Sequence, residues 1–167
     1  MLTYLLITLG VFTRLIPHGW NFTPVLAIGL FAGCYLNRKW AVITPLILLF
    51  VTDIALGFHE TMPFTWGSMI IISLWGTRLK NRLSMTRVLL SGLVASIFFF
   101  LFTNFGAWLF IYPRTLAGFS ECFTLAIPFF RNTLLSTWVY SAVLFGLYEW
   151  AASKVKNTSL EKILIFR

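Results

Sequence analysis

The stretch VLLSGLVASIFFFLFTNFGAWLFI, residues 88–111, decides the fold class because it contains no charged residue. A helix needs roughly 20 apolar residues to cross the hydrocarbon core of a bilayer. This stretch meets that length, and five shorter or similar apolar runs lie on either side of it. We expect six helices, at approximately residues 2–16, 22–36, 41–58, 63–77, 88–111 and 127–152, and a short basic tail at 153–167.

The overall composition points to the same class of protein. The 167 residues are 59% hydrophobic and 11% charged, whereas soluble domains average about 45–50% and about 25%. Because nothing alternates with period two, helices are favoured over a barrel. The sequence predicts one all-α domain over residues 1–167, an integral membrane bundle of six transmembrane helices. A net charge of +8 does not indicate nucleic-acid binding in a chain with so little polar surface.

Basic residues distinguish the two ends of the predicted helices. Ten of the 13 Lys and Arg residues follow the second helix, follow the fourth helix or lie in the tail: Arg38, Lys39, Arg78, Lys80, Arg82, Arg87, Lys154, Lys156, Lys162 and Arg167. Cytoplasmic loops are enriched in Lys and Arg. We therefore expect a multi-pass protein of the inner (cytoplasmic) membrane with both termini cytoplasmic. A cleaved signal peptide is the alternative for the first run, which lacks a basic leader and a cleavage site.

The remaining polar residues gather at the opposite, outer end. Ionisable groups at such depth usually face a cavity or a partner, which predicts a ligand pocket that opens outward. The candidate substrate-binding residues are Arg14, His18, Asn21, Asp53, His59, Asn104, Trp108, Tyr112, Arg131 and Asn132. A helix beginning at Pro128 would place Arg131 and Asn132 in its first turn. The arginines would bind an anionic or carbonyl edge, Asn104 and Asn132 would orient the ligand, and Trp108 would stack on a flat ring.

Each candidate also has a purely structural explanation. In that interpretation Arg14 and Arg131 extend toward lipid headgroups, and Asp53 pairs with one of them. Asn104 then ties helices together, the two histidines are solvated loop residues, and the nearby aromatic residues form an interfacial belt. Both interpretations remain open at this point.

Several kinds of chemistry have no motif in this chain. It lacks a phosphate-binding glycine loop, a Gly-x-Ser-x-Gly elbow and a His-Glu-x-x-His helix. We expect no enzyme activity, no cofactor and no metal site. Cys34 and Cys122 have no cysteine or histidine at metal-ligand spacing, so they are interpreted as small apolar residues. Gly29 and Gly33 permit close helix packing, either inside the chain or against another membrane subunit.

Six short segments together resemble a known family. They are Arg14-Leu-Ile-Pro-His18, Asn21-Phe-Thr-Pro24, Asp53 with Leu56-Gly-Phe-His59, Thr103-Asn-Phe-Gly106, Tyr112-Pro113 and Ile127-Pro-Phe-Phe-Arg-Asn-Thr133. This set resembles a family of small bacterial membrane proteins that looks related to the S components of energy-coupling-factor (ECF) transporters. The resemblance implies six helices, a vitamin-type ligand near the outer face, and a transmembrane coupling subunit with two ATPases. The first run lacks the Ala-x-x-x-Ala docking patch common in S components.

The sequence thus leads to one functional hypothesis and two alternatives. The hypothesis is an S-component-like membrane subunit that takes up a small organic nutrient, a vitamin or its precursor. One alternative is a proton-coupled carrier in which Asp53 titrates. The other is a membrane scaffold that transports nothing.

Overall fold

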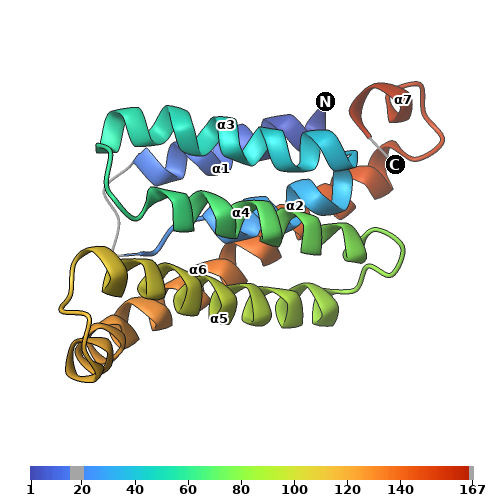
Figure 1. Cartoon of the computed structure of the whole chain (residues 1–167). Coiled ribbons are helices and arrows are strands. Elements are labelled where there is room, and N and C mark those ends of the chain that lie inside the picture. The colour runs from blue at the N-terminus through green and yellow to red at the C-terminus, as the bar shows by residue number, and fades with distance from the viewer. Residues whose placement is uncertain (16–20, 166–167) are drawn as a thin grey trace.

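The computed structural model describes residues 1–15 and 21–165, and every regular element in them is a helix (Figure 1). The long helices are α1 (Leu2–Leu15), α2 (Val25–Tyr35), α3 (Arg38–Leu56), α4 (Met62–Gly76), α5 (Met85–Phe110) and α6 (Leu116–Val155). A 3-10 turn, η1 (Thr77–Leu79), follows α4, and the single-turn helix α7 (Glu161–Leu164) lies near the C-terminus. The prediction of an all-α chain is therefore confirmed for the described residues.

Two helices begin three residues earlier than predicted because polar side chains cap them. Asn37 Oδ1 accepts a hydrogen bond from Trp40 N at 3.1 Å and begins α3. Ser84 Oγ accepts one from Arg87 N at 3.3 Å and begins α5. An N-cap satisfies a backbone donor that has no partner within the helix. The first turns of these helices contain polar residues, so a prediction from apolar runs places the helix starts too late.

Helix α6 is the clearest correction to the predicted elements. It begins at Leu116 rather than at residue 127 and continues for 40 residues through Pro128. Thr115 caps it, accepting a hydrogen bond from Gly118 N at 3.1 Å. The prediction was wrong because Ser120, Glu121 and Thr124 interrupt the apolar pattern of segment 116–126 and Pro128 resembles a helix start. A proline inside a helix removes one backbone hydrogen bond and is no proof of a helix start.

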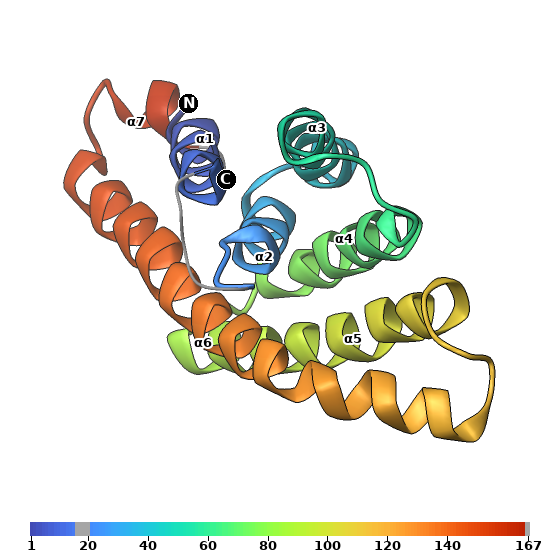
Figure 2. The ribbon, with the colours of Figure 1, turned by 90° about the vertical axis from the view of Figure 1, so that its left-hand side faces the viewer.

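The central helix of the bundle is α2, which contacts all five other long helices (Figures 1 and 2). Ten of its 11 residues are buried. Its last turn packs aromatic rings against α6: Phe31 meets Phe145 edge to face, with ring centroids 5.2 Å apart. Tyr35 Oη also donates a hydrogen bond to Glu149 Oε1 at 2.7 Å. A helix that is apolar on all sides can be stable only when it is surrounded in this way.

The glycine pair in α2 packs inside the chain rather than forming an outer face. Gly29 and Gly33 are both buried against α4. A Cβ atom on Gly33 would overlap the carbonyl oxygen of Ser73, and one on Gly76 would lie 2.5 Å from Leu30 O. The backbones of α2 and α4 approach so closely that only glycine fits at both positions. The structure thus favours internal packing over partner docking for this pair.

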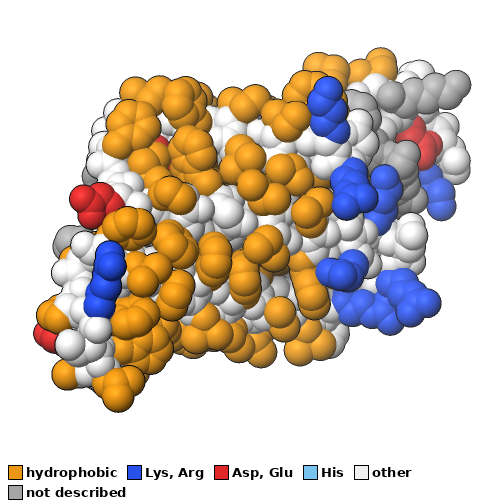
Figure 3. Space-filling model, in the orientation of Figure 1, with side chains coloured by type: hydrophobic (Ala, Val, Ile, Leu, Met, Phe, Trp, Pro, Cys, Tyr) orange, Lys and Arg blue, Asp and Glu red, His pale blue; other side chains and the backbone are white. Residues whose placement is uncertain are grey.

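The two ends of the bundle differ in charge (Figure 3). Lys and Arg side chains gather where α2 and α4 end and α3 and α5 begin, and hydrophobic side chains cover the middle of the face shown. Met1 and the single-turn helix α7 lie at this basic end, where the amino group of Met1 contacts Ile163 O at 3.2 Å. The opposite end carries the α1–α2, α3–α4 and α5–α6 connections.

Candidate functional site

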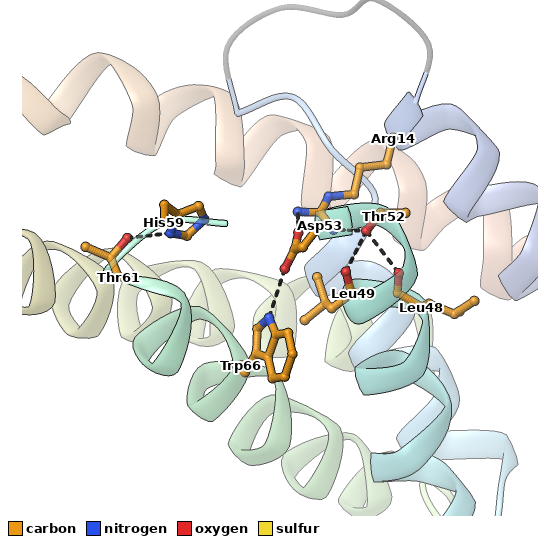
Figure 4. A network of polar contacts seen from close by, with 8 residues as sticks. All are labelled: Arg14, Leu48, Leu49, Thr52, Asp53, His59, Thr61 and Trp66. Atoms are coloured by element: carbon orange, nitrogen blue, oxygen red, sulfur yellow. Dashed lines mark hydrogen bonds and ion pairs between the residues drawn. The ribbon is translucent and has the colours of Figure 1, made fainter. Parts of the chain in front are cut away.

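A buried ion pair ties three helices together near the less basic end (Figure 4). Arg14 Nη2, at the end of α1, lies 2.7 Å from Asp53 Oδ1 in α3. Asp53 Oδ2 accepts a hydrogen bond from Trp66 Nε1 in α4 at 2.9 Å. Arg14 Nη1 donates to the Thr52 hydroxyl, which itself donates to carbonyl oxygens of the preceding turn.

This network occupies both oxygens of the Asp53 carboxylate. Asp53 is 2% exposed, and a buried carboxylate is tolerated only when it is paired and hydrogen-bonded. Of the two interpretations of Asp53, the geometry favours the structural one, since the residue pairs with an arginine. Arg14 neutralises the carboxylate and still reaches the cavity described next.

A cavity of about 320 Å³ lies beside the ion pair, among the helix ends at the less basic end. Its wall combines one cation, one imidazole, two amides and five threonine hydroxyls with apolar side chains of the surrounding helices. Its polar lining residues are Arg14, Asn21, Thr23, His59, Thr61, Thr65, Thr103, Asn104 and Thr133. Its apolar lining residues are Val25, Leu26, Leu49, Phe99 and Ala107. A smaller cavity of about 90 Å³ shares five of these residues and extends toward aromatic side chains of α5 and α6.

Three residues of the polar wall, Thr103, Asn104 and Thr133, offer hydrogen-bond acceptors. Thr103 Oγ1 donates to Phe99 O at 2.7 Å, and Thr133 Oγ1 donates to Phe129 O at 3.0 Å. The Asn104 amide nitrogen donates to Phe100 O at 2.7 Å. Each hydroxyl hydrogen is used in this way, and so is one of the two Asn104 amide hydrogens, whereas the two hydroxyl oxygens and the Asn104 side-chain carbonyl oxygen keep lone pairs. These three groups can accept hydrogen bonds from a ligand.

The structure brings together only some of the predicted site residues. Four of them line the cavity: Arg14, Asn21, His59 and Asn104. Asp53 lies behind Arg14 and is not part of the wall. His18 falls outside the described residues.

The other predicted residues lie away from the cavity. Trp108 Nε1 donates to Pro113 O at 3.1 Å, and its ring packs edge-on against Phe119. Tyr112 does not line the cavity. Arg131 and Asn132 lie in the middle of α6 rather than in its first turn, and Arg131 is exposed. The residue of this segment that does line the cavity is their neighbour, Thr133.

The residues that sequence reasoning missed are mostly threonines. The cavity wall includes Thr23, Thr61, Thr65, Thr103 and Thr133. A threonine in an apolar helix forms a hydrogen bond to the preceding turn and carries no charge. Composition therefore does not mark it as a candidate site residue. The signal that was available is the recurrence of threonine at outer helix ends, beside residues already selected for their charge or amide group.

Comparison with known proteins gives one match. A model of a family of unknown function, DUF6580, matches residues 1–160. The chain belongs to DUF6580. No curated protein and no solved structure matches it.

The two thiols of this DUF6580 protein form no site. Cys34 and Cys122 are both free and buried. Cys122 lies inside α6, and its Sγ contacts Asn104 O in α5 at 3.4 Å. Within the described part of the chain, no three His, Cys, Asp or Glu residues are grouped to hold a metal ion.

Proposed function

We propose that this DUF6580 protein is a membrane subunit that binds a small organic nutrient, a vitamin or its precursor, at the outer face of the cell membrane. The observation that carries the proposal is the cavity of about 320 Å³ at the end of the bundle opposite to the basic end. Cavities that bind small molecules measure about 300–1,000 Å³. The protein would act as a binding subunit and not as an enzyme.

The proposed membrane location is supported by two helices that are long and apolar enough to cross a bilayer, α3 and α5. The core helix of a soluble protein is mostly buried, whereas only 28% of the α3 span and 22% of the α5 span are buried in the chain. Large apolar side chains point outward along α5, including Leu90, Val94, Ile97 and Leu101. Lipid is the solvent that such a surface favours. In our proposal all six long helices lie in the membrane, where α1, α2 and α4, with 14, 11 and 15 residues, are shorter than the roughly 20 residues of a full helical span.

The proposed orientation follows from the charges. The basic end carries most of the cations, and Lys and Arg favour the cytoplasmic side. Both termini would then be cytoplasmic in the inner membrane, and the cavity would face outward. The contact between Met1 and the C-terminal region supports this arrangement, because six spans return the chain to its starting side.

The chemistry of the cavity favours a neutral ligand that is rich in hydrogen-bond donors. The charge of Arg14 is balanced by Asp53, and no carboxylate lines the cavity. The acceptors of Thr103, Thr133 and Asn104 would receive N–H or O–H groups of the ligand. Phe99 and the aromatic residues of the smaller cavity would contact its apolar face.

ATP-driven transport would need a partner that supplies the ATPase, since the given sequence has no phosphate-binding loop. The resemblance to S components suggests a transmembrane coupling subunit with two ATPases. With Gly29 and Gly33 packed internally, docking would use another face. The exposed apolar surface of α1, which includes Leu5, Leu9 and Phe12, is available for it.

A binding assay on purified protein tests the proposed cavity directly. Native mass spectrometry of gently extracted protein would first identify a retained small molecule. Thr103→Val and Thr133→Val keep side-chain size but remove one acceptor each, so each should weaken its binding roughly two- to tenfold, as expected for one hydrogen bond. Thr124→Val is the matched control, because Thr124 is an exposed residue of α6 outside the cavity.

The outcomes separate the hypotheses. Weaker binding in both cavity variants, with the control unchanged, is the expected result. Equal binding in all three variants would contradict the cavity assignment. Uptake into liposomes by this chain alone, driven by a pH gradient, would favour a proton-coupled carrier. Absence of any ligand together with one constant protein partner would favour a scaffold.

A further inference from the structure

A second pocket lies at the basic end, far from the cavity among the outer helix ends. It has a volume of about 600 Å³ and is formed where α2 ends, α3 begins and α4 passes into η1. Its lining residues are Gly33, Leu36, Asn37, Arg38, Leu74, Thr77, Arg78 and Lys80. Three cations and one amide thus surround one hollow, and no carboxylate lines it.

The cations of this pocket have no carboxylate partner within the described residues. The one salt bridge among the described residues joins Arg14 and Asp53, at the other end of the bundle. Two carboxylates near the basic end are engaged elsewhere: Glu149 accepts from Tyr35, and Glu161 accepts from Asn157 N at 2.8 Å. Within the described residues, none of the three pocket cations therefore forms a salt bridge.

The polar groups of the pocket are partly held in place. The Arg78 guanidinium carbon lies 4.7 Å from the centre of the Trp75 ring, a cation–π contact that restrains the side chain. The Asn37 carboxamide oxygen caps α3, which leaves its amide N–H groups as donors. Arginine, lysine and amide donors around one hollow match the oxygens of a phosphate group.

The surroundings of the pocket favour a lipid as the source of that phosphate. Leu36 and Leu74 line it beside the cations. Trp75 and Trp40 are 37% and 43% exposed at the same end, as tryptophan side chains often are at a membrane interface. Next to Trp75, Ile71 is also exposed on α4, so acyl chains could lie along an apolar surface while the headgroup enters the pocket.

We propose that this pocket binds the phosphate headgroup of an anionic phospholipid of the inner leaflet. Basic pockets between membrane helices on the cytoplasmic side are suited to such headgroups. The site depends on the proposed membrane location and orientation, but not on the outer cavity or its ligand. Its failure would therefore leave the nutrient-binding proposal intact.

Lipid retention measures the proposed site in the full-length chain. The protein is reconstituted in nanodiscs of equal parts phosphatidylglycerol and phosphatidylcholine, extracted, and analysed by native mass spectrometry. We expect one phosphatidylglycerol to be retained in preference to phosphatidylcholine. In an Arg78→Gln, Lys80→Gln variant this preference should fall about tenfold for each cation removed, because each substitution removes a charge-assisted hydrogen bond to the headgroup phosphate.

A control variant separates a pocket from diffuse surface charge. Arg82→Gln, Lys154→Gln removes the same number of charges at the basic end, but both residues are exposed and neither lines the pocket. The proposal predicts that this variant retains the lipid as the unmodified chain does. Equal losses in the two variants, or no preference for phosphatidylglycerol in the unmodified chain, would overturn the proposal.

Competition with inorganic phosphate distinguishes a lipid headgroup from a free phosphate ion as the ligand of this pocket. If the headgroup of a lipid is the ligand, excess inorganic phosphate should neither displace the retained phosphatidylglycerol nor raise the melting temperature in neutral detergent. Displacement of the lipid, together with stabilisation by phosphate alone, would overturn the lipid assignment and identify a site for a free anion.

Discussion

Arg14 has two roles in this structure that the sequence presented as alternatives. It neutralises the buried carboxylate of Asp53, and it also lines the outer cavity. Pairing with Asp53 balances the charge of Arg14, which weakens its attraction for an anionic ligand. This is why we propose a neutral ligand, although the sequence alone suggested that arginines bind an anionic or carbonyl edge.

A double-mutant cycle tests the structural role of the ion pair. Arg14→Leu removes the cation and leaves a buried carboxylate, so it should lower the free energy of unfolding by about 3–5 kcal/mol. In Arg14→Leu, Asp53→Leu no charge is left unpaired, and this variant should be more stable than Arg14→Leu alone. Denaturant unfolding in detergent measures both values. If the stability loss of the double variant equals the sum of the losses in Arg14→Leu and Asp53→Leu, the two side chains do not couple.

At the scale of elements, the contact between α2 and α4 shows why glycine positions matter. The backbones meet at Gly33 and Gly76, where a Cβ atom would lie less than 3.0 Å from backbone atoms of the facing helix. Backbone atoms cannot move aside as a flexible side chain can. The central helix can therefore pack in this position only with glycine at both places.

Alanine substitutions test this contact and include their own control. Gly33→Ala and Gly76→Ala should each destabilise the protein by about 1–3 kcal/mol, since the helices must separate. Gly146 lies inside α6, and a Cβ atom added there would meet nothing within 4 Å, so Gly146→Ala should instead stabilise by about 0.5–1 kcal/mol. Melting temperatures of the purified variants measure the contrast. Similar melting temperatures for all three would contradict the close packing.

The sequence predicts the helices better than it predicts the site, for physical reasons. Long apolar runs give α3 and α5 directly, because burial or lipid contact requires them. The start of α6 was missed since Ser120, Glu121 and Thr124 interrupt the apolar pattern there and Pro128 suggests a boundary. The cavity threonines were missed because a hydroxyl bonded to its own helix does not disturb an apolar pattern. The rotation of each helix about its axis decides which polar side chains face the cavity. The positions of the apolar runs do not determine that rotation.

At the scale of the whole molecule, the two ends have different chemistry. One end combines cations with Met1 and α7, and the other combines hydroxyl and amide groups around a cavity. Exposed apolar side chains cover much of the surface between them. In our proposal the first end contacts the anionic inner leaflet and the second admits a nutrient from outside. Each end could lose its function without unfolding the other.

Cysteine labelling in intact cells tests the central claim most directly. In a background of Cys34→Ala and Cys122→Ala, Thr61→Cys places a thiol on the cavity wall and Asn81→Cys places one at the basic end. A membrane-impermeant maleimide should label the first variant in intact cells and the second only after the membrane is permeabilised. Labelling of Asn81→Cys but not Thr61→Cys in intact cells would contradict the account.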